Sequence, residues 1–104
     1  MQKKFVSTMR KGFQMTFENG LTASVQWGAG NYCDNHFPSD IDFSCSKDAQ
    51  SDTAEVAVIH NGNLINIERF LPEECSFDDV VAGWLTPEQV LCFLNKVKEY
   101  QVEE

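Results

Sequence analysis

The chain has no long apolar run. No stretch approaches the about 18 consecutive apolar residues that a membrane-spanning helix needs. The opening segment, MQKKFVSTMRKGF, lacks the uninterrupted apolar core of a signal peptide. From these absences we expect a cytoplasmic protein that does not bind membranes.

Basic residues are scarce after the first eleven positions. The 104 residues include 8 Lys and Arg against 16 Asp and Glu, which gives a net charge of -8. Residues 1–11 carry four basic side chains and no acidic one, a charge of +4, so residues 12–104 carry -12. An acidic field repels nucleic acid and favours basic partners. We therefore expect a basic N-terminal arm and an acidic body that does not bind nucleic acid directly, although such charge can also serve solubility.

No catalytic or cofactor-binding motif is complete. The run Gly28–Gly30 lacks the third glycine and the following helix of a dinucleotide-binding turn. The segment that begins at Asp40 opens like a calcium loop, but Cys45 and Ser51 stand where that loop needs glycine and glutamate. We therefore expect a protein that is not an enzyme and needs no cofactor.

The four cysteines leave two further alternatives open. A zinc site would use Cys33, His36, Cys45 and Cys75. Of these, only Cys33 and His36 have the close spacing of a ligand pair. Cys33 could instead be a nucleophile, with His36 or His60 as its base. Ordinary reduced cysteines are the simpler interpretation, so no metal is assigned.

Residues 55–67 predict a β-hairpin. Two β-branched runs flank Asn61-Gly62, a dipeptide that favours a two-residue type I′ turn. This turn pairs Val58 with Ile65, Ile59 with Leu64 and Val56 with Ile67. Both faces of the strand pair are largely apolar, which indicates a position near the centre of a sheet.

Residues 13–27 predict a second hairpin with a different turn. A three-residue loop at Glu18–Gly20 gathers the apolar residues on one face, whereas a two-residue loop mixes them with polar ones. The resulting pairs are Phe17 with Leu21, Met15 with Ala23 and Phe13 with Val25. We expect a left-handed Gly20 in a G1 bulge, with the Thr, Ser and Gln side chains facing solvent.

A C-terminal helix completes the expected fold. Thr86 is the predicted N-cap, Pro87 the first helical residue and Gln89 the partner in a capping box, with the helix running to about Tyr100. The stripe expected to face the sheet is Val90, Phe93, Leu94, Val97 and Tyr100, and the residues expected to turn away are Cys92, Lys96 and Glu99. The sequence thus predicts an α+β fold: a small antiparallel sheet built from two β-hairpins, with one helix (86–100) packed on it, in a single domain spanning 1–104.

Two acidic segments are the expected contact surface. Residues 28–53 form a long loop region, and loops of this length are often functional. Residues 68–79 are similarly acidic. The expected partner-binding carboxylates are Asp34, Asp40, Asp42, Asp48, Asp52, Glu73, Glu74, Asp78 and Asp79. Aromatic contact candidates are Tyr32, Phe37 and Trp84, for which core packing is the alternative.

Four segments carry a resemblance to a known group: Phe17–Gly20, Val25–Gly28, Gly30–Cys33 and Val81–Glu88. Across most of the chain, the sequence resembles small acidic uncharacterised proteins of phages, prophages and bacteria. The group has no assigned mechanism, so no catalytic residue carries over. The resemblance implies an inhibitor that occludes the basic, nucleic-acid-binding surface of a host defence protein, such as a nuclease or CRISPR effector. The alternative is a homodimer or assembly protein joined through a strand edge or an aromatic patch.

Overall fold

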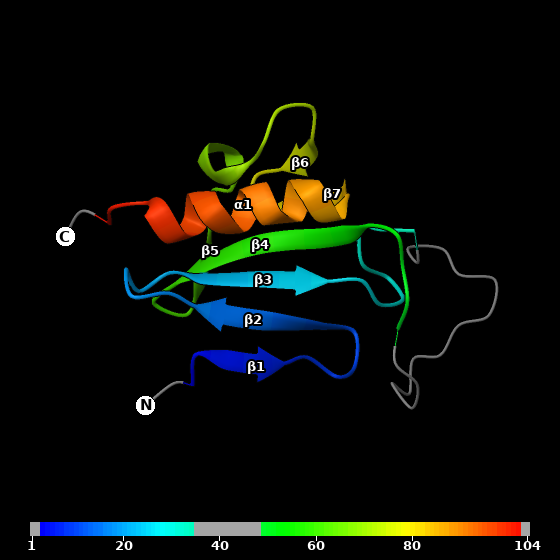
Figure 1. Cartoon of the computed structure of the whole chain (residues 1–104), viewed down its shortest axis with the longest axis horizontal. Helices are drawn as coiled ribbons and strands as arrows, with labels where there is room; N and C mark the ends of the chain where they lie inside the picture. Colours follow the sequence, from blue (N-terminus) through cyan, green and yellow to red (C-terminus); the bar gives the residue numbers. More distant parts are fainter. Residues whose placement is uncertain (1–2, 35–48, 103–104) are drawn as a thin grey trace.

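The structure is a computed structural model and describes residues 3–34 and 49–102. Its elements are β1 (Phe5–Ser7), β2 (Gly12–Thr16), β3 (Thr22–Gln26), β4 (Ala54–His60), β5 (Asn63–Ile65), the 3-10 helix η1 (Glu68–Phe70), β6 (Ser76–Asp78), β7 (Val81–Leu85) and α1 (Pro87–Glu99). The strands form one antiparallel sheet in the order β1-β2-β3-β4-β7-β6, and β5 also pairs with β4 (Figure 1). The predicted α+β class is confirmed.

Helix α1 covers one face of the sheet. It packs against β3, β4, β7 and η1. The core between helix and sheet includes Leu21, Ala23, Val25, Val56, Val58, Ile67, Phe70, Ala82, Leu85, Phe93 and Val97. Within the described residues, no helix has the length and apolar character needed to cross a membrane.

The start of α1 follows the sequence prediction. The side-chain oxygen of Thr86 accepts a hydrogen bond from the backbone N–H of Gln89 at 3.3 Å, and the Gln89 side chain accepts one from the Thr86 N–H at 2.9 Å. This reciprocal pair is the capping box, and it satisfies N–H groups that the first turn would leave unpaired. Phe93 and Val97 on the predicted stripe are fully buried.

The β4-β5 hairpin is confirmed near its turn and wrong at its far end. Asn61 and Gly62 have φ angles of 52° and 80°, as a type I′ turn requires. The pairs Val58 with Ile65 and Ile59 with Leu64 are present. Val56, however, pairs with Ala82 of β7 rather than with Ile67, which is buried at the start of η1. Strand β7 therefore takes over the ladder where β5 ends.

The β2-β3 hairpin has the predicted three-residue loop. Gly20 has a φ of 88°, and the Phe17 N–H donates to the Leu21 carbonyl at 2.9 Å. The predicted pairs of Met15 with Ala23 and Phe13 with Val25 are present. The three-residue turn, which was predicted only from the separation of polar and apolar side chains, is thus confirmed.

The expected solvent-facing polar side of this hairpin is wrong for β3. Thr22 and Ser24 are only 4% and 8% exposed, because β3 lies inside the sheet between β2 and β4. Their hydroxyl groups have partners: Thr22 Oγ1 lies 2.8 Å from Thr16 Oγ1, and Ser24 Oγ accepts from Gln26 Nε2 at 3.2 Å. These hydrogen bonds lower the cost of burying polar groups.

Three strands were not anticipated from the sequence. The expected basic arm forms the edge strand β1, which pairs with β2. The segment Glu68–Asp79 contains β6, and β7 joins β6 to the centre of the sheet. Strand β7 contains Trp84 and leads directly into α1.

Candidate partner-binding surface

An irregularity in β7 places Trp84 at the surface. The register between β4 and β7 shifts between Ala54 and Val56, so that β7 has an extra residue at this point. Trp84 has a φ of 57°, in the left-handed region that bulky L-residues rarely adopt. Gly83 and Leu85 on either side are buried, whereas Trp84 is 46% exposed. The bulge therefore turns the indole out of the sheet.

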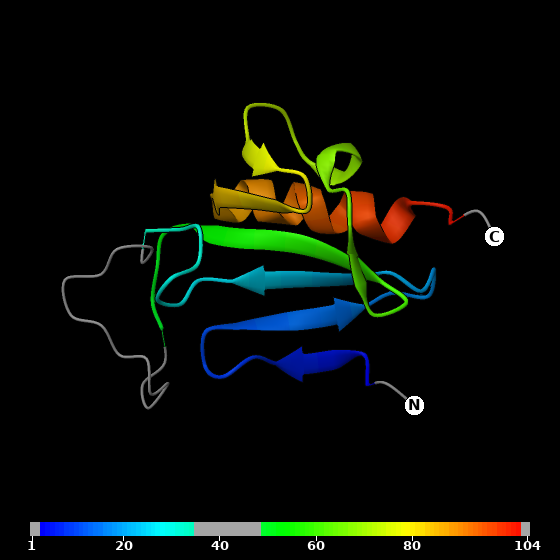
Figure 2. The same ribbon diagram turned by 180° about the vertical axis from the view of Figure 1, so that it is seen from behind.

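Tyr32 stacks on this indole. The two ring centroids are 5.8 Å apart and the ring planes differ by 18°. The backbone also joins the pair, because the Trp84 N–H donates to the Tyr32 carbonyl at 2.8 Å. Figure 2 shows the cyan segment after β3, which contains Tyr32, at the end of the sheet where β4 begins. Tyr32 is 39% exposed and Trp84 46%, so each residue of the stacked pair is partly accessible to solvent.

Two neighbours fix the position of Tyr32. The Glu55 carboxylate on β4 accepts from the Tyr32 N–H at 2.9 Å and from Asn31 Nδ2 at 3.2 Å. On the other side, a Cβ added to Gly83 would lie 2.5 Å from Tyr32 Cβ and 2.8 Å from its carbonyl oxygen. Only glycine leaves room for this approach, which explains a glycine inside a strand.

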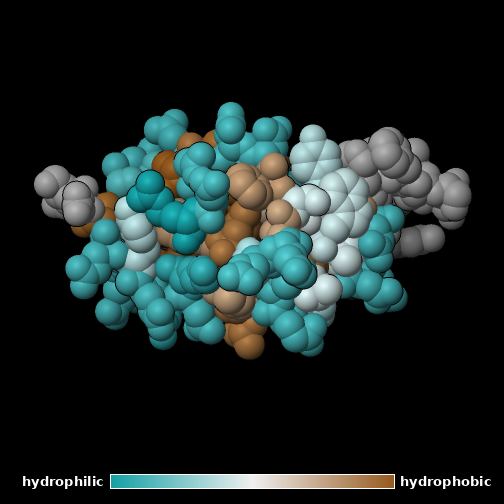
Figure 3. Space-filling view, turned by 90° about the horizontal axis from the view of Figure 1, so that it is seen from above, coloured by the Kyte–Doolittle hydropathy of each residue, from teal (hydrophilic) through white to brown (hydrophobic). Residues whose placement is uncertain are grey.

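A cavity of about 210 Å³ adjoins the stacked pair. Its lining residues are Tyr32, Ser76, Phe77, Asp78, Val81, Gly83 and Trp84. Phe77 is 49% exposed, and Asp78 Oδ1 accepts a hydrogen bond from the Asp79 N–H at 2.9 Å. We call Tyr32, Phe77, Asp78 and Trp84 the Tyr32–Trp84 surface. Figure 3 looks from above, onto the side where β6 lies in Figure 1, and shows hydrophobic residues next to hydrophilic ones.

The structure brings some of the predicted carboxylates together. Asp34 and Asp52 are exposed and line one open pocket of about 400 Å³. Asp34 Oδ1 accepts from the Thr53 hydroxyl at 2.8 Å, which ties the segment after Tyr32 to the start of β4. Asp78 joins the Tyr32–Trp84 surface instead. The expected acidic surface therefore contains at least two separately lined parts.

The other predicted contact residues either line neither of these two pockets or lie outside the described residues. Glu73, Glu74 and Asp79 are exposed in the segments flanking β6. The predicted residues outside the described ranges are His36, Phe37, Asp40, Asp42, Cys45 and Asp48. Phe77 was missed by the sequence interpretation. Its signal was an apolar residue between the polar Ser76 and Asp78, as expected for a short edge strand.

The cysteines of the described residues have different surroundings. Cys33 is buried, and its Sγ lies 3.9 Å from the Gly28 carbonyl oxygen. Cys75 is half-buried; burial raises the pKa of its thiol, and the charge of nearby Cys92 raises it further. Cys92 was expected to face away from the core but is itself half-buried. In the described part of the chain, no three His, Cys, Asp or Glu side chains gather as metal ligands.

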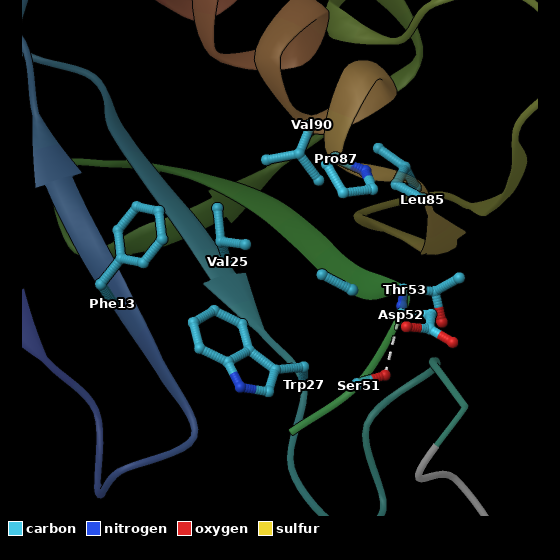
Figure 4. Close-up of a pocket in the computed structure, with 10 residues that line it drawn as sticks. Phe13, Val25, Trp27, Ser51, Asp52, Thr53, Leu85, Pro87 and Val90 are labelled. Atoms are coloured by element: carbon cyan, nitrogen blue, oxygen red, sulfur yellow. Dashed lines mark hydrogen bonds between the residues drawn. The ribbon is translucent and has the colours of Figure 1, made fainter. Parts of the chain in front are cut away.

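A second hollow lies beside the start of α1, on the helix-covered face (Figure 4). Its volume is about 310 Å³, and its lining residues are Phe13, Val25, Trp27, Ser51, Asp52, Thr53, Ala54, Leu85, Pro87 and Val90. Phe13 and Trp27 meet edge to face, with ring centroids 6.2 Å apart. The Trp27 indole N–H donates to the Ala49 carbonyl at 2.9 Å. This hollow offers apolar surface, and Asp52 supplies its one ionisable side chain among the described lining residues.

The arrangement defines a small α+β protein with an exposed aromatic pair beside a carboxylate at one side of its sheet. Comparison of the chain with protein-family models finds no match, and comparisons with curated proteins and with solved structures find none either. The function is therefore inferred from the chemistry of the described residues.

Proposed function

We propose that this protein is a non-enzymatic binding module that occludes a basic surface of a partner protein. The observation that carries the proposal is the exposed Tyr32–Trp84 stack, held by Glu55 and Gly83 beside the Asp78 carboxylate. Exposed aromatic side chains anchor protein interfaces because they bury a large area with few rotatable bonds. A neighbouring carboxylate favours a cationic partner.

The charge of the chain supports a basic partner. A net charge of -8 steers positively charged surfaces toward the protein before contact. Exposed carboxylates such as Asp34 and Asp52 can then compete with nucleic-acid phosphates for the partner's Arg and Lys side chains. Occlusion needs no chemistry beyond this competition.

The partner class follows from the kind of surface that such a competitor would block. Nucleases and CRISPR effectors hold nucleic acid on basic surfaces, and the resemblance to phage and prophage proteins favours a host defence protein of this type. In this proposal the protein acts as a phage-type inhibitor.

The test is capture of binding proteins from a bacterial lysate, with and without an excess of double-stranded DNA. The wild-type protein is compared with a variant that combines Asp34→Lys, Asp52→Lys and Asp78→Lys. We expect the wild type to retain a protein that DNA or high salt releases, and the variant to lose it. A tight complex that is indifferent to DNA, salt and charge reversal would overturn the proposal.

One observation favours assembly as a second candidate function. Phe5 on the edge strand β1 is 73% exposed, and an open strand edge can pair with another chain. Light scattering distinguishes this candidate: a stable dimer that Phe5→Lys dissociates supports assembly, whereas a monomer at micromolar concentration contradicts it.

A further inference from the structure

We propose that the Tyr32–Trp84 surface binds an arginine side chain of the partner, with the guanidinium stacked against an aromatic ring and paired with Asp78. This inference rests on the proposed function and makes it more specific. It assigns the selectivity for arginine over lysine to four residues: Tyr32, Phe77, Asp78 and Trp84.

Ring geometry favours a planar cation. Tyr32 and Trp84 are nearly parallel, differing by 18°, and both are partly exposed. A guanidinium group is flat and weakly hydrated, so it can lie against an aromatic face and lose little solvation. A lysine ammonium is compact and strongly hydrated, so it gains less from the same contact. The surface therefore distinguishes two cations of equal charge.

The cavity provides a carboxylate within the same site. Asp78 lines it together with both stacked rings. Asp78 Oδ1 already accepts from the Asp79 N–H, which helps to fix the side chain. A carboxylate has two oxygens and about four acceptor positions, so Asp78 retains capacity for the N–H groups of a guanidinium.

The hollow is small and open to solvent. Pockets that enclose drug-sized ligands have volumes of about 300–1,000 Å³, whereas this one measures about 210 Å³. A single long side chain can lie in a hollow of this size. Phe77 adds an apolar wall against which the methylene groups of an arginine can pack.

The backbone conformation of Trp84 is an independent observation in favour of a binding role. A φ of 57° is strained for tryptophan, and glycine or asparagine would adopt it more readily. The strain is maintained by the Trp84 N–H bond to Tyr32 and by the burial of Leu85. Its result is a ring already held at the surface, so binding requires little reorganisation.

The experiment compares three fluorescently labelled peptides of equal length: arginine alternating with glycine, lysine alternating with glycine, and citrulline alternating with glycine. Citrulline keeps the shape of arginine but not its charge. Binding is followed by fluorescence anisotropy at fixed salt. We expect the arginine peptide to bind about tenfold more tightly than the lysine peptide, and the citrulline peptide to bind most weakly.

Variants assign this preference to the surface. Trp84→Ala and Asp78→Asn should each bring the affinities for arginine and lysine peptides to within about threefold of each other. Trp84→Phe should retain part of the preference, which guards against a folding defect in Trp84→Ala. Phe5→Ala is the matched control, because it removes an exposed aromatic ring from the opposite edge of the sheet and should preserve the preference.

The outcomes separate the two proposals. Equal, salt-dependent binding of arginine and lysine peptides by the wild type overturns the arginine site but leaves an acidic binding surface intact. A preference for arginine that persists in Trp84→Ala also overturns the site. No binding of either cationic peptide contradicts both the site and the proposed function.

Discussion

The Glu55 carboxylate accepts hydrogen bonds from the backbone N–H of Tyr32 at 2.9 Å and from the Asn31 side chain at 3.2 Å. Glu55 is half-buried on β4, a strand inside the sheet, so it links a surface loop to the interior of the sheet. The position of Tyr32 therefore depends on a side chain that does not belong to the Tyr32–Trp84 surface.

Replacing Glu55 tests this link. Glu55→Ala should lower the free energy of unfolding by about 1 kcal/mol, because two donors lose a charged acceptor but can reach water. It should also weaken the near-ultraviolet circular dichroism of the aromatic stack. Glu55→Gln keeps one acceptor oxygen and should have a smaller effect in urea unfolding. Equal stability and unchanged dichroism in both variants would contradict the positioning role.

Trp84→Asn separates stability from binding. Asparagine tolerates the left-handed conformation, so the variant recovers about 1–2 kcal/mol of backbone strain while it loses about 0.5–1.5 kcal/mol of ring stacking. We expect urea unfolding to show a change of less than about 1 kcal/mol, together with weaker binding of arginine peptides. Strong destabilisation with unaffected binding would assign Trp84 to packing.

Asn19 secures the end of α1 from the β2-β3 loop. Its Nδ2 donates to the carbonyls of Val97 at 2.7 Å and Tyr100 at 2.8 Å, and its Oδ1 accepts from the Leu21 N–H at 3.0 Å. Asn19→Ala should cost about 1–2 kcal/mol in the free energy of unfolding. Asn19→Asp should cost more, because it sets a carboxylate against helix-terminal carbonyls. Asn95→Ala, an exposed site on α1, is the control and should change stability little.

The raised pKa of Cys75 predicts a pH dependence. Burial and the charge of nearby Cys92 disfavour its thiolate in the folded protein, whereas the unfolded thiol titrates near its ordinary value of 9.0. Below pH 9.0 the Cys75 thiol is protonated in both the folded and the unfolded protein, so its ionisation does not lower the free energy of unfolding. Above it the unfolded chain releases the proton more readily, so stability falls as the pH rises through the folded-state pKa.

The pH dependence is measured by thermal unfolding of the wild type and of Cys75→Ala at pH values below and above 9.0. Above pH 9.0 the stability of the wild type should fall relative to that of Cys75→Ala. Parallel profiles at all pH values would show that Cys75 contributes no such dependence.

Local signals accounted for the elements that the sequence predicted. The left-handed pair at Asn61-Gly62 and the capping box of Thr86 with Gln89 are formed by residues close together in the chain. Strands β1, β6 and β7 have no comparable local sequence signal. The pairing of each of these short strands depends on contacts with the rest of the sheet. The same holds for Thr22 and Ser24, whose burial follows from the central place of β3.

The candidate surface was predictable only in part. From residue type alone, the sequence predicts Tyr32, Trp84 and Asp78 as separate contact candidates. Their association depends on a bulge in β7 and on pairing between distant segments, neither of which has a local sequence signature. The sequence predicts Glu55 only as a strand residue, and its hydrogen bond to Tyr32 forms only because β4 and the segment after β3 lie side by side in the fold.

The most direct test of the account follows amide and indole N–H signals of isotope-labelled protein by nuclear magnetic resonance during titration with the arginine peptide. The account predicts saturable shifts concentrated at Tyr32, Phe77, Asp78 and the Trp84 indole, weakening at high salt. Absence of shifts at these residues, or shifts concentrated instead around Phe5 and β1, would contradict it.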